Sequence, residues 1–564
     1  MESFRTLIDA LNAAPGDRLF VTAWVDEDEH EDLTFAEFRG RSRAQARFLS
    51  RQGIVTGDRV VILMPQNIAA MAAFVGAMMI GAVPAFLAYP NFKVEPSKYS
   101  GGLEGVTANL AARAVVIDDE FPDELLGHVQ LRDGCKLLRA GNIAATDDAE
   151  LFVCDIHGDN LAFIQHSAGT TGLQKGVALT HRAVLTQIRH LAQALRIDAS
   201  ADRIYSWLPL YHDMGLIACF MLPMICHVPV IMQSPLDWVM QPGTMLQVIN
   251  DYQCTLAWLP NFAFQFVPRR TPRERSSNYS LASVRALINC SEPVRAASLN
   301  EFRQSFAALG LKPGALQSSY AMAENVFAVT QSDLTQPDGP PHLWADGQRF
   351  RAGHEAVPVA EGTPGALELV SSGRLLPKHQ LRIVSEAGRA LADGKVGEVL
   401  VRSDCLFQGY FHRPDLTADV LHDGWYHTGD LGFLLEGELY VVGRKKDLMI
   451  IGGENLYPQD IEEAASAHPA IHDGRMVAFG IYNANLGTED IVVVGEVERE
   501  ELLDNASQIE SEIRGRIVAA LGIAVRTIYL KPPRWIVKST AGKPARSGTR
   551  EKLLREHPEL NAES

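Results

Sequence analysis

Short apolar runs alternate with longer stretches of mixed polarity through the first half of the chain. The runs lie at residues 59–64, 83–87, 114–118, 161–165 and 228–232. Short apolar runs bounded by turn-forming residues are typical of strands buried on both faces, and the stretches between them are long enough for helices. Strands joined by helices form βαβ units, in which the sheet is mainly parallel. The pattern therefore predicts an α/β fold.

The pattern changes in the last third of the chain. A strand-like run at 437–442, with others before it, predicts a β-rich subdomain. A polar break at 443–447 follows and is a candidate hinge. The mixed helical and strand-like runs beyond it would make a compact α+β module. We therefore expect a large N-terminal αβ domain at residues 1–442 and a small mobile C-terminal domain at residues 443–564.

Two uncharged stretches, at 68–88 and 214–232, are long enough to be tested as membrane spans. The first is rich in Ala, Gly and Met and is better explained as a buried helix running into a buried strand. The second is interrupted by Pro223, His227 and Pro229. A proline inside a helix costs about 3 kcal/mol, so core strands and turns are the better interpretation. We expect no membrane span.

Composition narrows the class of protein. The chain has 564 residues, of which 47% are hydrophobic and 21% charged, and its formal net charge is −16. This is ordinary for a globular protein, and the acidic balance argues against a nucleic-acid binder. The seven cysteines include no Cys-x-x-Cys pair, which favours reduced buried thiols over a disulfide framework or a zinc site. With no signal-peptide pattern at the N-terminus, we expect a cytoplasmic protein.

The strongest local signal is a glycine- and hydroxyl-rich loop directly after the apolar run at 161–165. Its candidate ligand-binding residues are Ser167, Gly169, Thr170, Thr171, Gly172 and Lys175. Glycines let backbone N–H groups converge on one point, while hydroxyls and a lysine add donors, so the loop suits a polyphosphate. It lacks the Gly-Lys-Ser/Thr ending of a Walker loop. A plain surface turn is the alternative.

Further motifs follow the loop in a fixed order. They are Tyr320-Ala321-Met322-Ala323-Glu324, Tyr426-His427-Thr428-Gly429-Asp430, Gly443-Arg444-Lys445-Lys446-Asp447 and Gly542-Lys543. In this order the motifs resemble the adenylate-forming superfamily, which contains acyl-CoA synthetases, peptide-synthetase adenylation domains and luciferases. Segments 206–216 and 455–462, and the 48 residues between Glu324 and Gly373, are most similar to fatty acyl-AMP ligases. The Gly-Gly-Glu-Asn run at 452–455 instead resembles CoA ligases.

The resemblance implies nucleotide-binding roles for several matched residues. Asp430, assisted by Arg444, would accept hydrogen bonds from the ribose hydroxyls. Tyr320 would stack on adenine, with Ser291 and Glu292 along the edge of the ring. The alternatives are structural, because a Thr-Gly-Asp turn or a tyrosine in the core is common.

The resemblance also implies catalytic roles. Lys543 would be the catalytic cation that bridges the substrate carboxylate and the α-phosphate, and Glu324 the carboxylate that binds Mg²⁺. His212 resembles the aromatic or imidazole residue that in the family forms a gate between the nucleotide and the acyl pocket. The same pattern places Lys446 at the pivot of the C-terminal domain. The alternatives are a surface glutamate, a satisfied histidine and a solvated lysine.

The resemblance thus implies an ATP- and Mg²⁺-dependent ligase. It would convert a fatty or other apolar carboxylic acid to its acyl-adenylate with release of pyrophosphate, and then transfer the acyl group to the phosphopantetheine thiol of an acyl carrier protein. One alternative is an acyl-CoA ligase that uses coenzyme A as acceptor. A second is a non-catalytic acyl- or nucleotide-binding protein, suggested by departures from the family pattern at Ala168, Gln174, Ala321 and Ala323.

Overall fold

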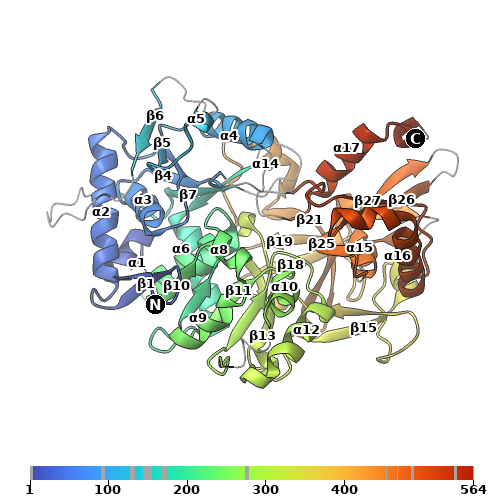
Figure 1. Cartoon of the computed structure of the whole chain (residues 1–564). Helices are drawn as coiled ribbons and strands as arrows, with labels where there is room; N and C mark the ends of the chain where they lie inside the picture. Colours follow the sequence, from blue (N-terminus) through green and yellow to red (C-terminus); the bar gives the residue numbers. More distant parts are fainter. Residues whose placement is uncertain are drawn as a thin grey trace.

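Figure 1 shows the computed structural model of the chain, with a large N-terminal part and a small C-terminal part. The structure describes residues 4–90, 96–126, 134–140, 143, 155–166, 175–272, 278–451, 454–466, 468–483, 488–538 and 543–562. We call the part up to strand β22 (Glu438–Arg444) the body, and the part from strand β23 (Met449–Ile451) the C-terminal module. A 3-10 turn, η5 (Lys445–Asp447), joins them.

The largest sheet of the body has nine strands. In spatial order they are β17 (Arg374–Leu375), β14 (Ala328–Gln331), β13 (Leu316–Ala321), β12 (Ala286–Asn289), β11 (Leu256–Leu259), β9 (Ile204–Ser206), β10 (Val230–Gln233), β1 (Leu19–Trp24) and β2 (His30–Thr34). Neighbouring strands from β13 to β1 are parallel, and the outer pairings are antiparallel. β11 and β12 are buried at every residue, as is typical of strands covered on both faces. The predicted α/β fold is confirmed.

A second sheet contains four parallel strands. They are β4 (Val83–Phe86), β3 (Arg59–Leu63), β5 (Ala114–Ile117) and β6 (Lys136–Arg139). The helix α3 (Ile68–Met79) is buried at nearly every position and leads into β4, so the uncharged stretch is the predicted buried helix and strand. Gly76 lets α3 approach α2 (Phe35–Arg51), because a Cβ there would lie 2.7 Å from the Ser42 carbonyl oxygen.

The other helices of the body surround these sheets. They are α1 (Leu7–Ala13), α4 (Pro96–Leu110), α5 (Asp123–Leu126), α6 (His181–Leu195), α7 (Leu222–Cys226), α8 (Pro235–Met240), α9 (Thr244–Tyr252), α10 (Ala263–Arg270), α12 (Ala296–Phe306), α13 (Gly347–Gly353) and α14 (Pro414–Val420). In the described part of the chain no helix is long and apolar enough to cross a membrane.

Two sequence-based interpretations are wrong in part. The run at 161–165 is a strand, β7 (Leu161–His166), but it pairs antiparallel with β8 (Gly176–Thr180) because a parallel crossover needs a longer connection. The stretch at 214–232 begins with a π-helix, η1 (Met214–Met221), and α7, not with strands. Pro223 lies in the first turn of α7, where a missing N–H is tolerated.

The predicted β-rich subdomain lies between the central sheet and the C-terminal module. Its strands are β18 (Gln380–Val384), β19 (Gly397–Arg402), β20 (Leu421–His422), β21 (Trp425–Leu435) and β22. All their pairings are antiparallel. A separate antiparallel pair of strands, β15 (His342–Asp346) and β16 (Ala366–Val370), lies within the segment between Glu324 and Gly373.

The C-terminal module has its own small core. Its elements are β23, β24 (Glu454–Leu456), α15 (Pro458–Ser466), β25 (Ile471–Asn483), β26 (Thr488–Val497), α16 (Ala506–Leu521), β27 (Thr527–Lys531), α17 (Arg546–Glu556) and α18 (Glu559–Ala562). Isoleucines at successive turns of α16, Ile509, Ile513 and Ile517, pack with Val493 of β26. This is the helical spacing of an apolar face, and it explains the α+β module predicted from the sequence.

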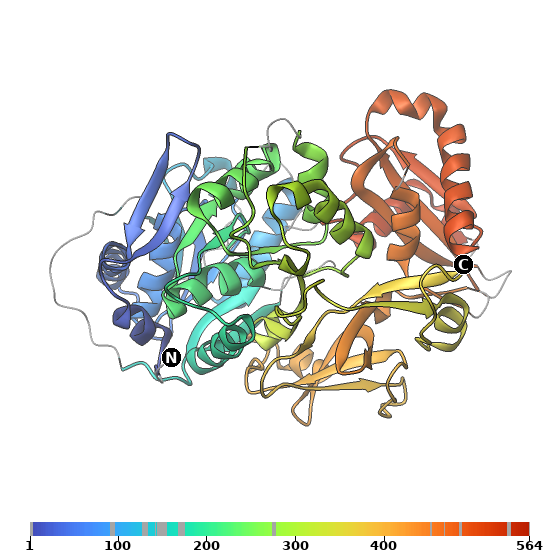
Figure 2. The same ribbon diagram turned by 90° about the horizontal axis from the view of Figure 1, so that it is seen from below.

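The module contacts the body at several places, among them an ion-pair site and an aromatic contact, and Figure 2 shows it at one end of the body, beside the β-rich strands. Arg295 of the body forms ion pairs with Asp460 (3.0 Å) and Glu463 (3.2 Å) of α15. Tyr457 of the module packs with Phe350 of α13, and their ring centroids are 6.0 Å apart. One contact is ionic and the other apolar.

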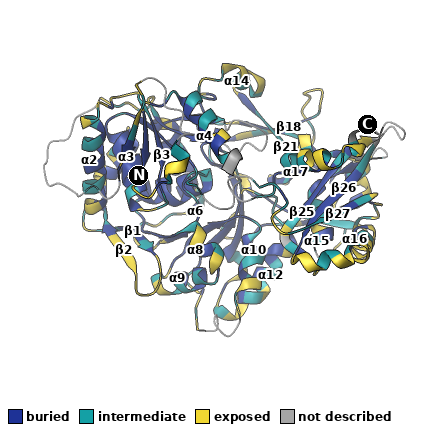
Figure 3. Ribbon diagram, turned by 45° about the horizontal axis from the view of Figure 1, so that its top comes forward, coloured by how far each residue is buried: buried dark blue, intermediate teal, exposed yellow. Residues whose placement is uncertain are grey.

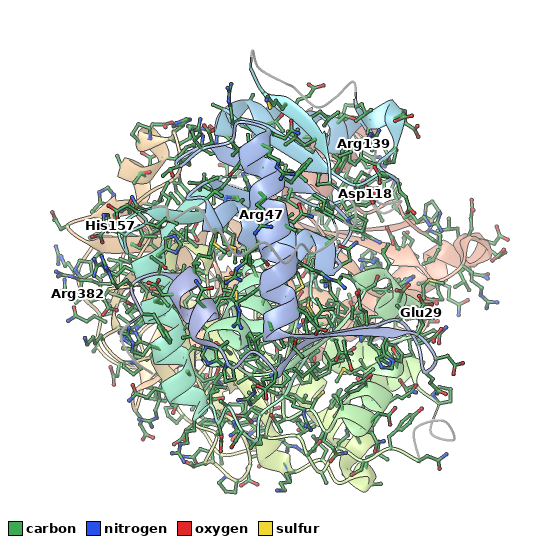
Figure 4. The ribbon with its side chains drawn as sticks, turned by 90° about the vertical axis from the view of Figure 1, so that its left-hand side faces the viewer. Glu29, Arg47, Asp118, Arg139, His157 and Arg382 are labelled. Atoms are coloured by element: carbon green, nitrogen blue, oxygen red, sulfur yellow. The ribbon has the colours of Figure 1, made fainter. Side chains whose placement is uncertain are left out.

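Most buried residues lie in and around the sheets, and exposed residues lie on the outer faces of helices such as α2, α15 and α16 (Figure 3). At the end of the body far from the module, Figure 4 shows Arg47 on α2 and, nearby, Arg139 and Asp118. Arg139 donates a 3.3 Å hydrogen bond to the Asp118 carbonyl oxygen. This charged end does not contribute to the cleft described below. Within the described ranges six cysteines are free and five of them are buried, as predicted.

Candidate active site

A large cleft with a volume of about 3030 Å³ lies between the body and the C-terminal module. Ten of the predicted site residues line it, namely Lys175, His212, Ser291, Glu292, Tyr320, Glu324, Asp430, Arg444, Lys446 and Lys543. The other five, Ser167, Gly169, Thr170, Thr171 and Gly172, lie outside the described residues. Motifs that are far apart in the sequence therefore border one cavity.

One wall of the cleft carries a carboxylate held between a tyrosine and an arginine. The Tyr320 hydroxyl donates a 2.6 Å hydrogen bond to Oδ2 of Asp430, and Nε of Arg444 lies 3.4 Å from Oδ1. Asp430 and Arg444 are register partners on β21 and β22, which fixes their position. Burial raises the pKa of Asp430, and Arg444 opposes this rise. An acceptor beside a cation and an aromatic ring suits the ribose and base of a nucleotide.

Glu324 lies on a 3-10 turn, η4 (Ala323–Asn325), and is also held by a tyrosine. The Tyr410 hydroxyl donates a 2.6 Å hydrogen bond to Oε1 of Glu324. Burial, together with the nearby Glu324, raises the pKa of Tyr410, so this hydroxyl keeps its proton. Nζ of Lys175 lies 4.6 Å from the centroid of the same ring. Tyr410 thus connects the lysine of the predicted phosphate loop to the predicted magnesium ligand.

Two residues beside the site have strained backbone conformations. Val326, two residues after Glu324, has φ 64°, and Ser291 has φ 71°. A positive φ is a true outlier for a β-branched residue such as valine. Strain of this kind persists only where the surrounding structure enforces it, and it is common at functional sites.

Lys543 reaches the cleft from the C-terminal module. Its Nζ donates a 2.7 Å hydrogen bond to the Ser291 carbonyl oxygen and lies 3.6 Å from Oε1 of Glu292. The other carboxylate oxygen of Glu292 accepts a 3.1 Å hydrogen bond from the backbone N–H of Phe262. The lysine from the predicted mobile domain therefore contacts the residues predicted to border adenine.

His212 and its neighbour Asp213 lie in the same cleft. Nε2 of His212 is buried without a hydrogen-bond partner among the described residues. Burial, reinforced by Lys543, lowers the pKa of His212 to about 4, so the ring is neutral at pH 7. Burial raises the pKa of Asp213 to about 6. Sequence reasoning named His212 but missed Asp213 and Tyr410, although the His-Asp pair adjoining an uncharged run was a visible signal for the former.

Aromatic side chains form a second, apolar part of the cleft. Trp207 lines the cleft and stacks on Trp238, with centroids 3.6 Å apart and planes 3° from parallel. Phe262 and Phe266 also line it, and Phe266 packs against Trp238 at 5.7 Å. Residues 256–266 thus begin as the core strand β11 and end at the cleft. This part offers an apolar surface next to the polar wall.

Comparisons with known proteins agree with the geometry. Residues 9–411 match the model of the AMP-binding enzyme family. The chain belongs to this family. It is 30% identical to the long-chain-fatty-acid–AMP ligase FadD32 of Mycolicibacterium smegmatis, over 93% of this chain and 89% of that protein.

Solved structures give the same result for the fold. One from a study of fatty acyl-adenylate ligases from E. coli and L. pneumophila has a TM-score of 0.88 and 28% identity, covering 99% of this chain and 98% of that one. A fatty acyl-adenylate ligase from L. pneumophila in complex with acyl adenylate and pyrophosphate has a TM-score of 0.74 and 26% identity, covering 98% and 96%. The resemblance to adenylate-forming enzymes is confirmed.

Proposed function

We propose that the protein is a fatty acyl-AMP ligase that uses ATP to convert a fatty acid to its acyl-adenylate. The observation that carries the proposal is the meeting of Tyr320, Asp430 and Glu324 of the body with Lys543 of the module in one cleft. The names of the fatty acyl-AMP ligase relatives support the substrate class. The apolar part of the cleft, beside the nucleotide wall, is where an acyl chain would lie.

The reaction requires positioning and charge stabilisation. A carboxylate oxygen of the fatty acid attacks the α-phosphorus of ATP, and the bond from that phosphorus to the bridging oxygen of pyrophosphate breaks. Asp430 and Arg444 would hold the ribose, and Lys175 would hold phosphate oxygens. Lys543 would stabilise the negative charge that develops between the carboxylate and the phosphate, an effect that is large in a site shielded from water.

Magnesium would bind at Glu324. The residue fits this role because it is a carboxylate at the cleft whose Oε1 is already oriented by Tyr410, and magnesium prefers carboxylate and phosphate oxygens. When bound, the ion would neutralise charge on the phosphate oxygens. The residues of the chain would supply the remaining contacts.

The second step would transfer the acyl group to the phosphopantetheine thiol of an acyl carrier protein. We place the mobile C-terminal domain at residues 443–564, with the remainder of the chain at 1–442 as the adenylation domain. Lys446 would be its pivot, and rotation would withdraw Lys543 and admit the thiol, as in other hinge closures. The ionic contacts of Arg295 and the apolar contact of Tyr457 support the docked position of the module that adenylation would use.

One assay tests the proposal and its acceptor. Purified protein is incubated with ATP, Mg²⁺ and a panel of carboxylic acids, and then with either coenzyme A or a phosphopantetheinylated carrier protein. Mass spectrometry is expected to detect a fatty acyl-adenylate that passes to the carrier protein. Acyl-CoA as the main product would instead make coenzyme A the acceptor. Absence of adenylate with every acid would overturn the proposal.

A further inference from the structure

Three side chains of types that can bind a metal ion, His190, Asp404 and Cys405, lie close together in the body. His190 comes from α6, and Asp404 and Cys405 follow the end of β19. Nδ1 of His190 lies 3.8 Å from Sγ of Cys405 and 3.8 Å from Oδ1 of Asp404, and Sγ lies 3.5 Å from the same carboxylate oxygen. None of the three belongs to a motif used in the proposed reaction.

The spacing of these atoms matches the edges of a tetrahedral zinc site. Bonds of about 2.3 Å to sulfur and about 2.1 Å to nitrogen or oxygen place the ligand atoms about 3.4–3.6 Å apart. The three observed separations are within a few tenths of an ångström of these values. On metal binding the Cys405 thiol, which donates to Asp404 in the structure, would release its proton to solvent, and the resulting thiolate and the carboxylate would together balance the charge of a divalent cation.

The burial of the three side chains and the access to them from solvent also suit a metal site. His190 and Cys405 are buried, whereas 41% of the Asp404 side chain is exposed and gives an ion a route from solvent. Lys378 and Arg189 are the nearby cations, and the two anionic ligands would offset their repulsion of a metal.

The cluster connects to the residue next to Glu324. The ring of His379 packs edge-on against His190 at 5.7 Å, and its Nε2 lies 2.9 Å from Nδ2 of Asn325. From the other side, the Ser403 hydroxyl donates a 2.5 Å hydrogen bond to Oδ1 of Asn325. Anything that fixes the cluster therefore restrains the turn that carries Glu324.

We propose that His190, Asp404 and Cys405 bind a divalent cation of the zinc class, with a water molecule as the fourth ligand. The metal joins α6 to the end of β19 and stabilises the turn at Glu324. Cysteine spacing cannot reveal this site, because its single cysteine is joined by a histidine more than two hundred positions earlier. The metal binding is independent of the proposed function, and only its effect on Glu324 rests on that function.

Cobalt titration of the full chain tests the site. The protein is stripped with a chelator and titrated with Co²⁺, whose bond to a thiolate gives a charge-transfer absorption band. We expect one equivalent to produce the band and Zn²⁺ to displace it. Cys405→Ser should abolish the band, and Cys226→Ser, a change at another buried cysteine, should leave it intact. A wild-type protein without the band, or a Cys405→Ser variant that keeps it, would show an ordinary hydrogen-bonded cluster.

Asp404→Asn provides a variant that is expected to fold, because the carboxylate is partly exposed. We expect its affinity for Co²⁺ to fall by about tenfold or more. Zn²⁺ should raise the Tm of the wild-type protein and raise that of Asp404→Asn less, and an equal rise in both would contradict the proposal. These measurements do not require adenylation, so a failure of the proposed function and a failure of the metal site are separate results.

Discussion

The body and the C-terminal module contribute to the cleft in different ways. In the body, Asp430 and Glu324 each accept a 2.6 Å hydrogen bond from a tyrosine that is distant in the sequence, so their positions are set without a ligand. The module contributes Lys543, which contacts the body through a carbonyl oxygen and lies 3.6 Å from a carboxylate. The comparison indicates a preorganised wall in the body and a cation that is positioned by the docking of the module.

The largest effect on the rate of adenylation is expected from a change at Lys543, which the module contributes to the cleft. Lys543→Ala should lower the rate of adenylation by about 10²–10³-fold, because it removes the group that we propose stabilises the developing charge. ATP binding, measured by calorimetry, should change far less, since the body supplies the nucleotide wall.

Lys531→Ala is the matched control, because Lys531 pairs with Glu556 inside the module and does not line the cleft. An adenylation rate in Lys543→Ala equal to that of the control would remove Lys543 from the mechanism.

The next largest effect is expected at His166, a buried histidine of the body, on the pH dependence of the free energy of unfolding. Burial lowers the pKa of His166 to about 4, whereas the unfolded chain binds this proton near pH 6.5. The unfolded state therefore holds more protons in this window, and the stability from neutral His166 is lost as the pH falls from 6.5 toward 4. The expected loss between pH 7 and pH 5 is ~2 kcal/mol. His166→Gln should reduce it, as measured by urea unfolding at both pH values.

His157→Gln serves as the comparison for this measurement, because 54% of the His157 side chain is exposed. If His166→Gln and His157→Gln show the same pH dependence of the free energy of unfolding, burial of His166 does not affect stability in the way described.

The sequence predicted the body better than it predicted the contacts between parts. Asp430 and Arg444 stand in ordered motifs, and the βαβ pattern is strong enough to place such motifs at one sheet edge. Tyr410 has no such signal, because a tyrosine in an apolar run is ordinarily a core residue. Its hydrogen bond is to Glu324, which lies 86 positions away in the sequence, so the contact exists only in the folded chain.

The ion pairs between Arg295 of the body and the module are equally invisible in the sequence. Nothing near Arg295 in the sequence identifies its partners, which are 165 or more positions away. The interpretation of residues 214–232 as strands and turns is wrong for a different reason, because a proline breaks the interior of a helix but is tolerated in a first turn, where Pro223 lies. Local sequence patterns thus predicted the helices, strands and motifs. The pairing of residues far apart in the sequence and the residues at which helices begin could be learned only from the structure.

Tyr410→Phe tests how far preorganisation of the body matters. Phenylalanine keeps a ring beside Lys175 but removes the hydroxyl that donates to Glu324, a hydrogen bond to a charged group worth about 1.5 kcal/mol or more. We expect kcat/KM for ATP to fall by about tenfold and half-saturation to need more Mg²⁺. Tyr482→Phe, at a residue that is 53% exposed, is the control. An unchanged Mg²⁺ dependence would mean that Glu324 needs no orientation by Tyr410.

Arg295→Gln tests the docking of the module and should have the smallest effect. It removes the ion pairs to Asp460 and Glu463, which are partly exposed and worth about 1 kcal/mol at most. Adenylation should fall a few-fold because Lys543 is placed less often, while transfer from a preformed acyl-adenylate to the thiol should not fall. Arg182→Gln breaks the exposed pair with Asp159 inside the body and should alter neither step. Equal losses in both steps for Arg295→Gln would indicate general destabilisation, and the role in docking would then be wrong.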